Sequence, residues 1–133
     1  MRYLLDTNIC IYLIKKHPRE VLIHFKKHSP RDVGISIITA FELDYGVNKS
    51  RFQKHSREAL DKFLMPLNIL ALDRSSAREA AEIRVELEAK GRPIGPYDLL
   101  IAGIARSRNL IVVTNNAKEF GRVKGLSHEN WVV

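Results

Sequence analysis

The sequence has little cysteine and no long hydrophobic run. Its 133 residues include a single cysteine, Cys10, which cannot form a disulfide within the chain, and this favours a reducing compartment. No apolar run approaches the roughly 18–20 residues that a membrane-spanning helix needs. The chain also reaches Asp6 without the apolar core of a signal peptide. We therefore expect a cytoplasmic protein with no membrane partner.

Three common kinds of functional motif are also absent. The histidines and the cysteine do not have the spacing of a zinc site. The 91–96 loop has prolines where a phosphate-binding loop needs backbone N–H donors. No Gly-x-Ser-x-Gly segment marks a serine hydrolase. These absences argue against a zinc protein, a P-loop protein and a hydrolase with a nucleophilic serine.

Acidic residues are outnumbered by basic ones. The 22 Lys and Arg residues against 15 Asp and Glu residues give a net charge of +7, which favours an anionic partner such as nucleic acid. The basic residues fall in patches, each of which is also explained as the solvated face of a helix. Arg92, just before Asp98 in the chain, is the best candidate for contacting a substrate beside the acids described below.

Short apolar segments alternate with helical segments over a length that suits one domain, residues 1–133. We expect strands at 2–6, 33–36, 68–72 and 110–114, and an edge strand at 131–133. We expect helices near 7–16, 20–28, 51–64, 76–90 and 98–108, with a turn or short helix at 119–123. A further helix is expected to begin at Ser36 or Thr39 and to run toward Val47. Thr7 or Asn8 is expected to cap the first helix, and Ser76 with Glu79 has the spacing of a capping box. Apolar strands separated by helices predict an α/β fold with a parallel sheet covered on both faces.

Carboxylate or amide side chains stand where the strongest apolar segments begin or end. They are Asp6 after Tyr3–Leu5, Glu42 after Ile35–Ile38, Asp98 before Leu99–Ala102, and the Asn115–Glu119 turn after Leu110–Val113. In open parallel sheets, ligands bind outside the carboxyl ends of the strands, so the fold can gather these residues at one edge. Carboxylates that converge beside apolar structure repel one another unless a cation meets them. Oxygen-only ligands favour Mg²⁺ or Mn²⁺.

Each acid also has a purely structural explanation. Asp6 can cap a helix, Asp98 can serve the dipole of a buried helix, and Glu42 and Glu119 can be solvated surface residues. The functional interpretation therefore rests on the four positions together.

Four motifs, in order, give a resemblance to a known family. They are Leu4-Leu5-Asp6-Thr7-Asn8, Ile38-Thr39-Ala40-Phe41-Glu42-Leu43-Asp44-Tyr45-Gly46, Gly91-Arg92-Pro93-Ile94-Gly95-Pro96-Tyr97-Asp98-Leu99-Leu100-Ile101-Ala102, and Val113-Thr114-Asn115-Asn116-Ala117-Lys118-Glu119-Phe120. Over essentially the whole chain, they resemble the PIN-domain ribonucleases, specifically the VapC-type toxins of bacterial toxin–antitoxin pairs.

The resemblance implies a three-layer α/β/α domain with a short-stranded, mostly parallel sheet and RNA cleavage that depends on Mg²⁺ or Mn²⁺. It also implies a homodimer and a cognate VapB-type antitoxin whose tail occupies the active site. Relatives with the Gly-Arg-Pro-Ile-Gly loop resemble toxins that cut tRNA, including initiator tRNA in its anticodon region. Other VapC toxins cut ribosomal RNA. We favour tRNA as the substrate of this chain.

By the same resemblance, Asp6, Glu42 and Asp98 are the core acids, with Asp6 and Asp98 binding the metal. Many relatives have an aspartate where this chain has Asn116 or Glu119. Asn116 carries no charge, so we expect Glu119 to be the fourth acid.

Asn8, Thr114 and Asn116 would be supporting polar groups. Three rivals stay open: a non-catalytic RNA-binding or interaction domain, a metal-dependent phosphotransfer domain, and a DNA-directed nuclease.

Overall fold

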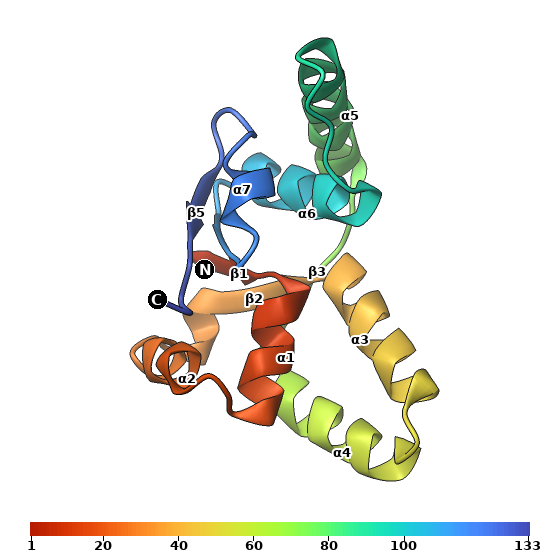
Figure 1. Cartoon of the computed structure of the whole chain (residues 1–133), viewed down its shortest axis with the longest axis vertical. Helices are drawn as coiled ribbons and strands as arrows, with labels where there is room; N and C mark the ends of the chain where they lie inside the picture. The colour runs from red at the N-terminus through yellow and green to blue at the C-terminus, as the bar shows by residue number, and fades with distance from the viewer.

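A parallel five-stranded sheet runs through the middle of the molecule (Figure 1). In the computed structural model, which describes residues 1–133, the strand order is β3-β2-β1-β4-β5 and every neighbouring pair is parallel. The strands are β1 (Tyr3–Leu5), β2 (Val33–Ser36), β3 (Asn68–Leu70), β4 (Ile111–Val113) and β5 (Ser127–Glu129). The predicted α/β class with a short-stranded parallel sheet is confirmed.

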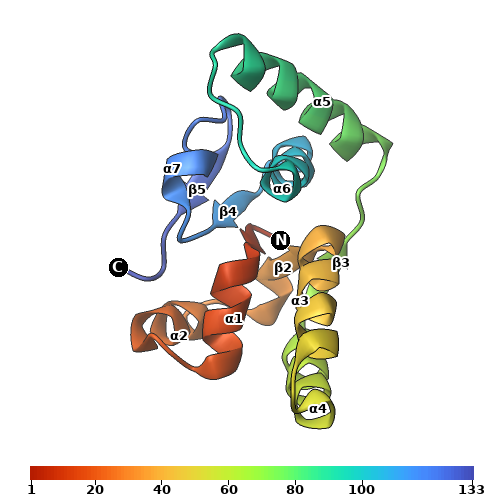
Figure 2. The same ribbon diagram turned by 45° about the vertical axis from the view of Figure 1, so that its right-hand side comes forward.

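Helices cover both faces of the sheet and make it the middle of three layers (Figures 1 and 2). One face carries α1 (Thr7–Lys15), α2 (Arg19–Lys26), α3 (Ile37–Lys49) and α4 (Gln53–Leu64). The other carries α5 (Arg74–Ala89), α6 (Pro96–Ser107) and α7 (Ala117–Phe120). A 3₁₀ turn at Pro30–Asp32 leads into β2. No helix is long and apolar enough to cross a membrane.

The side chains of β1 show why both faces need cover. Tyr3 and Leu5 belong to the core beneath α1–α4, whereas Leu4 belongs to the core beneath α5–α7. Successive side chains of a strand point to opposite faces, so an all-apolar strand is buried only between two layers. All three residues are less than 5% exposed.

Two helix caps differ from those predicted. Asp6 caps α1, because its carboxylate accepts the backbone N–H of Thr7. The capping role that Asp6 could have is thus confirmed, and Thr7 and Asn8 are not the cap. Asp73, and not Ser76, caps α5, with its Oδ1 accepting both the N–H and the hydroxyl of Ser76. Glu79 therefore does not close a capping box and pairs with Arg106.

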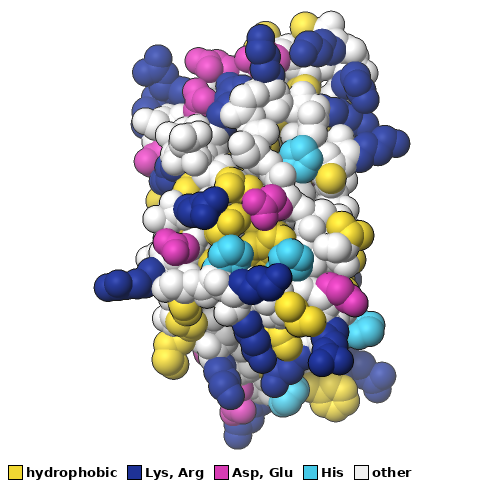
Figure 3. All heavy atoms as spheres, turned by 90° about the vertical axis from the view of Figure 1, so that its left-hand side faces the viewer, with side chains coloured by type: hydrophobic (Ala, Val, Ile, Leu, Met, Phe, Trp, Pro, Cys, Tyr) yellow, Lys and Arg dark blue, Asp and Glu magenta, His cyan; other side chains and the backbone are white.

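The strand predicted for the C-terminal segment is wrong. The fifth strand is Ser127–Glu129, and the predicted strand at 131–133 does not form. Trp131 is instead 1% exposed and packs against Tyr3, with His24 and His28 of the α2 region stacked on its ring. Histidine and hydrophobic side chains are seen side by side in the middle of the face in Figure 3. The apolar segment 131–133 therefore packs onto the protein by burying the indole of Trp131 and does not form a strand.

Candidate active site

The four acids meet at the carboxyl edge of the sheet. Asp6 follows β1 directly, and Glu42 lies in the second turn of α3, which starts at the end of β2. Asp98 is the third residue of α6, two residues later in that helix than predicted. Glu119 lies on α7, just after β4. Burial is the main cause that raises the pKa of Asp6, and the charges of Glu42 and Glu119 raise it further. The charges of Asp6, Glu42 and Glu119 also raise the pKa of Asp98, so side chains from four elements share one electrostatic environment.

Asp6 is held rigidly at the centre of this edge. Its Oδ1 accepts the N–H of Thr7 at 2.8 Å, and its Oδ2 accepts the hydroxyl of Thr114 at 2.8 Å. Thr114 follows β4 directly and is completely buried, and its own oxygen accepts the N–H of Asn116 at 2.8 Å. Asp6 thus serves as a helix cap and as a member of the acid cluster at once.

Thr7 connects Asp6 to Glu42. The Thr7 hydroxyl donates to Glu42 Oε1 at 2.7 Å and lies 3.1 Å from the hydroxyl of Thr39. Thr39 is in turn fixed because its N–H donates to the Ser36 hydroxyl at the cap of α3. Glu42 is therefore oriented by the Thr7 hydroxyl, which Thr39 holds in turn, and is not a freely solvated surface side chain.

Asn116 joins the other two acids. Its amide nitrogen donates to Asp98 Oδ2 at 3.2 Å and to Glu119 Oε2 at 2.8 Å. The position at which this chain has an amide in place of an acid is thus a bridge between two carboxylates. Such a bridge holds Glu119 within reach of Asp98 without adding a fifth negative charge.

Burial is the main cause that raises the pKa of Asp98, to about 8, followed by its hydrogen bond with Glu119 and the charges of Asp6, Glu119 and Glu42. The hydrogen bond to Asp98 lowers the pKa of Glu119. We interpret the pair as sharing one proton, which resides on Asp98. Burial also raises the pKa of Asp6.

A divalent cation fits this donor set. No ion pair joins Asp6, Glu42, Asp98 or Glu119 to a Lys or Arg side chain. All the donors are oxygens, which suit hard cations. No group of three or more His, Cys, Asp or Glu side chains in this structure could hold a metal ion. The fit to a divalent cation therefore rests on the oxygen donors and on their lack of ion pairs.

Two of the predicted site residues make no polar contact with the acids. Asn8 is exposed on α1, and Arg92 is exposed in the 91–95 loop. Neither side chain forms a hydrogen bond or an ion pair with the four acids. The roles of Asn8 and Arg92 therefore stay predictions.

Two residues near the acids were not predicted. Thr7 is one, and its place within Asp6-Thr7-Asn8 was the only sequence signal for it. Arg122 is the other: its charge lowers the pKa of Glu119, and its guanidinium donates to the Pro93 carbonyl at 3.1 Å. Its spacing of three residues from Glu119 places both on one side of a helical turn. Arg122 is thus a cation whose charge acts on one of the four acids.

Comparison with known proteins identifies the family. Residues 3–126 match the family model of the PIN domain. The chain belongs to the PIN-domain family. Among its relatives are the tRNA(fMet)-specific endonuclease VapC of Shigella flexneri, 43% identical over 98% of both chains, and that of Salmonella typhimurium, 42% identical over 98% of both chains. This PIN domain is thus a VapC-type ribonuclease, as the motifs predicted.

Solved VapC structures share the fold closely. The structure of VapBC2 from Rickettsia felis bound to a promoter DNA fragment superposes with a TM-score of 0.92, at 42% identity, covering 98% of this chain and 99% of that chain. The structure of DNA-bound VapBC from Salmonella typhimurium gives the same TM-score and identity, with 98% of both chains covered. PIN-domain nucleases depend on divalent metal ions, in agreement with the donor set of this PIN domain.

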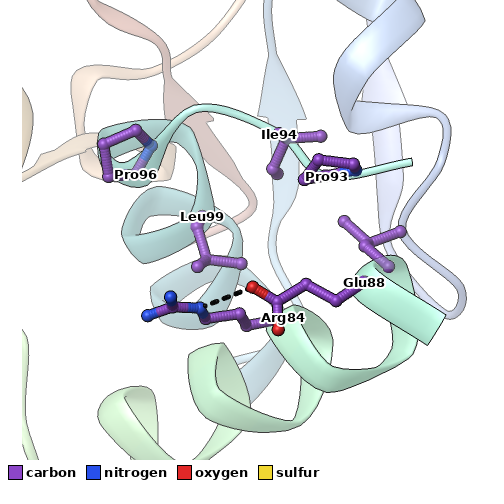
Figure 4. A pocket seen from close by; sticks show the side chains of 7 residues that line it. Arg84, Glu88, Pro93, Ile94, Pro96 and Leu99 are labelled. Carbon is purple, nitrogen blue, oxygen red and sulfur yellow. Dashed lines mark hydrogen bonds and ion pairs between the residues drawn. The ribbon is translucent and has the colours of Figure 1, made fainter. Parts of the chain in front are cut away.

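Two of the hollows on the surface of this PIN domain differ in how near they lie to the acids. An apolar groove of about 420 Å³ between α1, α3 and α4 reaches Glu42 and is lined mainly by Ile11, Ile14, Leu43, Val47, Ala59 and Leu60. A smaller hollow of about 210 Å³ lies between α5 and the 93–96 loop, where Arg84 donates to Glu88 at 3.0 Å (Figure 4). The first hollow borders the acid cluster, and the second contains none of the four acids.

Proposed function

We propose that this chain is a Mg²⁺-dependent endoribonuclease toxin that cleaves tRNA, with initiator tRNA in its anticodon region as the favoured substrate. Two relatives named as tRNA(fMet)-specific endonucleases, each covered over 98% of its length, support the choice of tRNA. The observation that carries the proposal is the convergence of four carboxylates, none of which forms an ion pair with a Lys or Arg side chain. We further propose that residues 1–133 act as a single domain in the cytoplasm, with Mn²⁺ able to replace Mg²⁺.

The acids divide into two roles in this proposal. Asp6 and Asp98, the two most desolvated carboxylates, would hold the metal. Glu42 and Glu119 complete the site, each fixed by one hydrogen-bonded neighbour, Thr7 and Asn116 respectively. Thr114 and Asn116 support them, whereas the supporting role first given to Asn8 has no contact behind it.

A bound divalent ion supplies a water of lowered pKa and shields the charge that develops on the scissile phosphate. Glu119 or Glu42 would orient that water or accept its proton, since general-base catalysis requires a carboxylate within hydrogen-bond reach. Asp98 must release its proton before it can act as a ligand. In-line attack by water on the phosphate, with departure of the ribose 3′ oxygen, leaves a 3′-hydroxyl and a 5′-phosphate.

The partner of this toxin is a VapB-type antitoxin. Structures of VapBC complexes from relatives with at least 98% of their chains covered support this partner. The apolar groove between α1, α3 and α4 suits an apolar segment of the antitoxin, because it runs up to Glu42. An antitoxin segment bound in this groove would bury apolar surface, which increases its affinity for the toxin. It would also block the access of RNA to the acids.

A second copy of the chain would cover the outer face of α3. Ile37, Phe41 and Tyr45 follow one another at helical spacing and are 45%, 53% and 59% exposed. The ring of Tyr97 packs edge-on against Phe41 with centroids 5.6 Å apart, and the edge strand β3 adds Ile69, 46% exposed. A continuous apolar surface of this kind marks an interface in a soluble protein, which supports the homodimer.

In vitro cleavage with end-mapping tests the proposed function. Purified chain, incubated with an initiator tRNA transcript, should give fragments with a 5′-phosphate and a 3′-hydroxyl in Mg²⁺ and none in EDTA. Equal cleavage in EDTA, or no cleavage of any tRNA by the antitoxin-free protein, would refute it.

A further inference from the structure

The most exposed aromatic side chain of the protein lies just beyond the end of α3, the helix that carries Glu42. Phe52 is 72% exposed and forms the turn between α3 and α4. Figures 1 and 2 show this turn projecting from the body of the molecule. Neither the metal site nor the apolar face of α3 explains an exposed phenylalanine at this position.

The turn that carries Phe52 is tied down by its own polar side chains. The hydroxyl of Ser50 accepts the N–H of Phe52 at 3.0 Å and is bonded to the hydroxyl of Ser56 at 2.9 Å. The amide of Gln53 donates to the Asn48 carbonyl at 3.0 Å. These bonds fix the backbone, so a ligand that stacks on Phe52 would not have to order the turn on binding.

Positively charged side chains lie near Phe52 in the chain. Lys49, Arg51 and Lys54 are exposed, and none of them takes part in an ion pair. Lys49 lies 5.5 Å from the ring centroid of Tyr45. A shallow hollow of about 520 Å³ beside Phe52 is lined by Arg51, Gln53, Lys54, His55 and one acid, Glu58. We call Lys49, Arg51, Phe52 and Lys54 the hairpin tip.

The hairpin tip lies within reach of an RNA held at the acids. Glu42 and Lys49 are both on α3, about 10 Å apart along its axis at 1.5 Å per residue. The next three residues add at most about 10 Å. Since successive nucleotides of a stacked strand are about 3.4 Å apart, Phe52 lies within about six nucleotides' length of Glu42.

We propose that the hairpin tip is a second RNA-binding site, at which Phe52 stacks on an unpaired base while Arg51 and Lys54 contact the flanking phosphates. Single-stranded loops present bases that stack on aromatic side chains, and a basic groove with an aromatic platform is the common form of such sites. The inference rests on the proposed function, because the base would belong to the same tRNA that is cut at the acids.

Binding of fluorescently labelled initiator tRNA, measured by anisotropy in EDTA so that no cleavage occurs, tests the inference. Phe52→Ala and Phe52→Leu should each raise the Kd at least about fivefold, the lower end of the effect of losing one stacked base. Phe52→Trp should bind like the wild type, because it keeps a ring. Arg51→Gln with Lys54→Gln should reduce the salt dependence of log Kd by about 1.4, or about 0.7 for each lost phosphate contact.

Matched controls separate stacking from general surface effects. Met65→Ala removes an apolar side chain that is 83% exposed at the other end of α4, and Arg74→Gln with Arg78→Gln removes two exposed cations from α5. Both should bind tRNA within twofold of the wild type. Thermal unfolding of every variant checks that the fold is intact.

The outcomes distinguish this inference from the proposed function. If the wild type binds and cuts tRNA and the Phe52 variants bind it equally well, only the hairpin tip assignment fails. It also fails if these variants lose affinity for the antitoxin alone, because the surface then serves a protein partner. If the wild type neither binds nor cuts tRNA, the proposed function fails and the inference falls with it.

Discussion

Asp98 is the residue whose chemistry depends most on its surroundings. It lies in the first turn of a helix whose interior residues, Ile101–Ala105, are buried, and it faces three other carboxylates. The N-terminus of α6 favours its negative charge, but burial and repulsion oppose that charge more strongly. A bound divalent cation would reverse this balance, so the same carboxylate can be protonated in the free protein and ionised in the active one.

Asp98→Asn should lower the rate of tRNA cleavage at least about a hundredfold, since loss of one preorganised charged group typically costs about 10²–10³ in rate. The variant should fold normally, because asparagine resembles the neutral form that the free site favours. Asp44→Asn is the matched control: Asp44 is exposed on α3 and pairs with Arg57. Cleavage by Asp44→Asn within twofold of the wild type, measured from initial rates, is expected. Full activity of Asp98→Asn would contradict the assignment.

The raised pKa of Asp98 predicts a pH dependence of stability in the absence of metal. An unfolded aspartate titrates near 3.8, and the folded one at about 8. Between these values the folded chain holds a proton that the unfolded chain has lost, so the free energy of unfolding falls as pH rises. The stabilisation is complete below about pH 4 and is gone above about pH 8.

The Tm in EDTA should therefore decline from about pH 5 to about pH 8 by more in the wild type than in Asp98→Asn. Added Mg²⁺ should offset the decline, because a cation that binds only the folded site stabilises it. Differential scanning calorimetry with and without Mg²⁺ measures both effects. Parallel declines in the two proteins would show that Asp98 is not protonated in the free site.

Helix α4 is the element that closes the apolar groove leading to Glu42. Ala59 lines this groove from α4 and is the smallest apolar side chain in it. Ala59→Trp should fill the groove and weaken antitoxin binding at least tenfold, while tRNA cleavage by the free toxin stays within threefold of the wild type. Ala89→Trp, at the exposed end of α5, is the matched control. Calorimetric titration with the VapB-type partner decides the matter: unchanged affinity for Ala59→Trp would place the antitoxin elsewhere.

Helix α3 presents its outer apolar face to solvent in a single chain. Phe41→Glu should convert the dimer to a monomer, because it places a charge in the middle of the Ile37–Phe41–Tyr45 face. Phe52→Glu introduces the same charge on an exposed phenylalanine outside that face and should leave the dimer intact. Light scattering after size-exclusion chromatography gives the mass of each. A dimeric Phe41→Glu would show that another surface joins the two copies.

Over the whole molecule, the sequence predicts well what depends on pattern and order. Near-continuous apolar strands between helices are typical of a parallel sheet, and the carboxyl ends of such strands meet at one edge, so the gathering of Asp6 and Glu119 was predictable. Features that depend on side-chain packing could not be predicted from the sequence. The contact of Thr7 with Glu42 requires the rotation of two helices about their axes, which spacing alone does not give.

Loops and chain ends limited the prediction in the same way. Arg122 donates to the carbonyl of Pro93, and its charge acts on Glu119. The path of the 91–95 loop brings Pro93 to Arg122, and the sequence alone does not give that path. Trp131 has neighbours from β1 and the α2 region that are remote in sequence, so its apolar segment was taken for a strand. These errors concern the supports of the site more than its acids.

Binding of Mn²⁺ measured by electron paramagnetic resonance tests most directly whether the four acids form a metal site. We predict that the wild-type protein and Asp44→Asn bind Mn²⁺ with the same affinity, and that Asp6→Asn and Asp98→Asn each weaken binding at least tenfold. We also predict that Mg²⁺ displaces the bound Mn²⁺. Undiminished Mn²⁺ binding by a protein with both Asp6→Asn and Asp98→Asn would contradict a metal site at the carboxyl edge of the sheet.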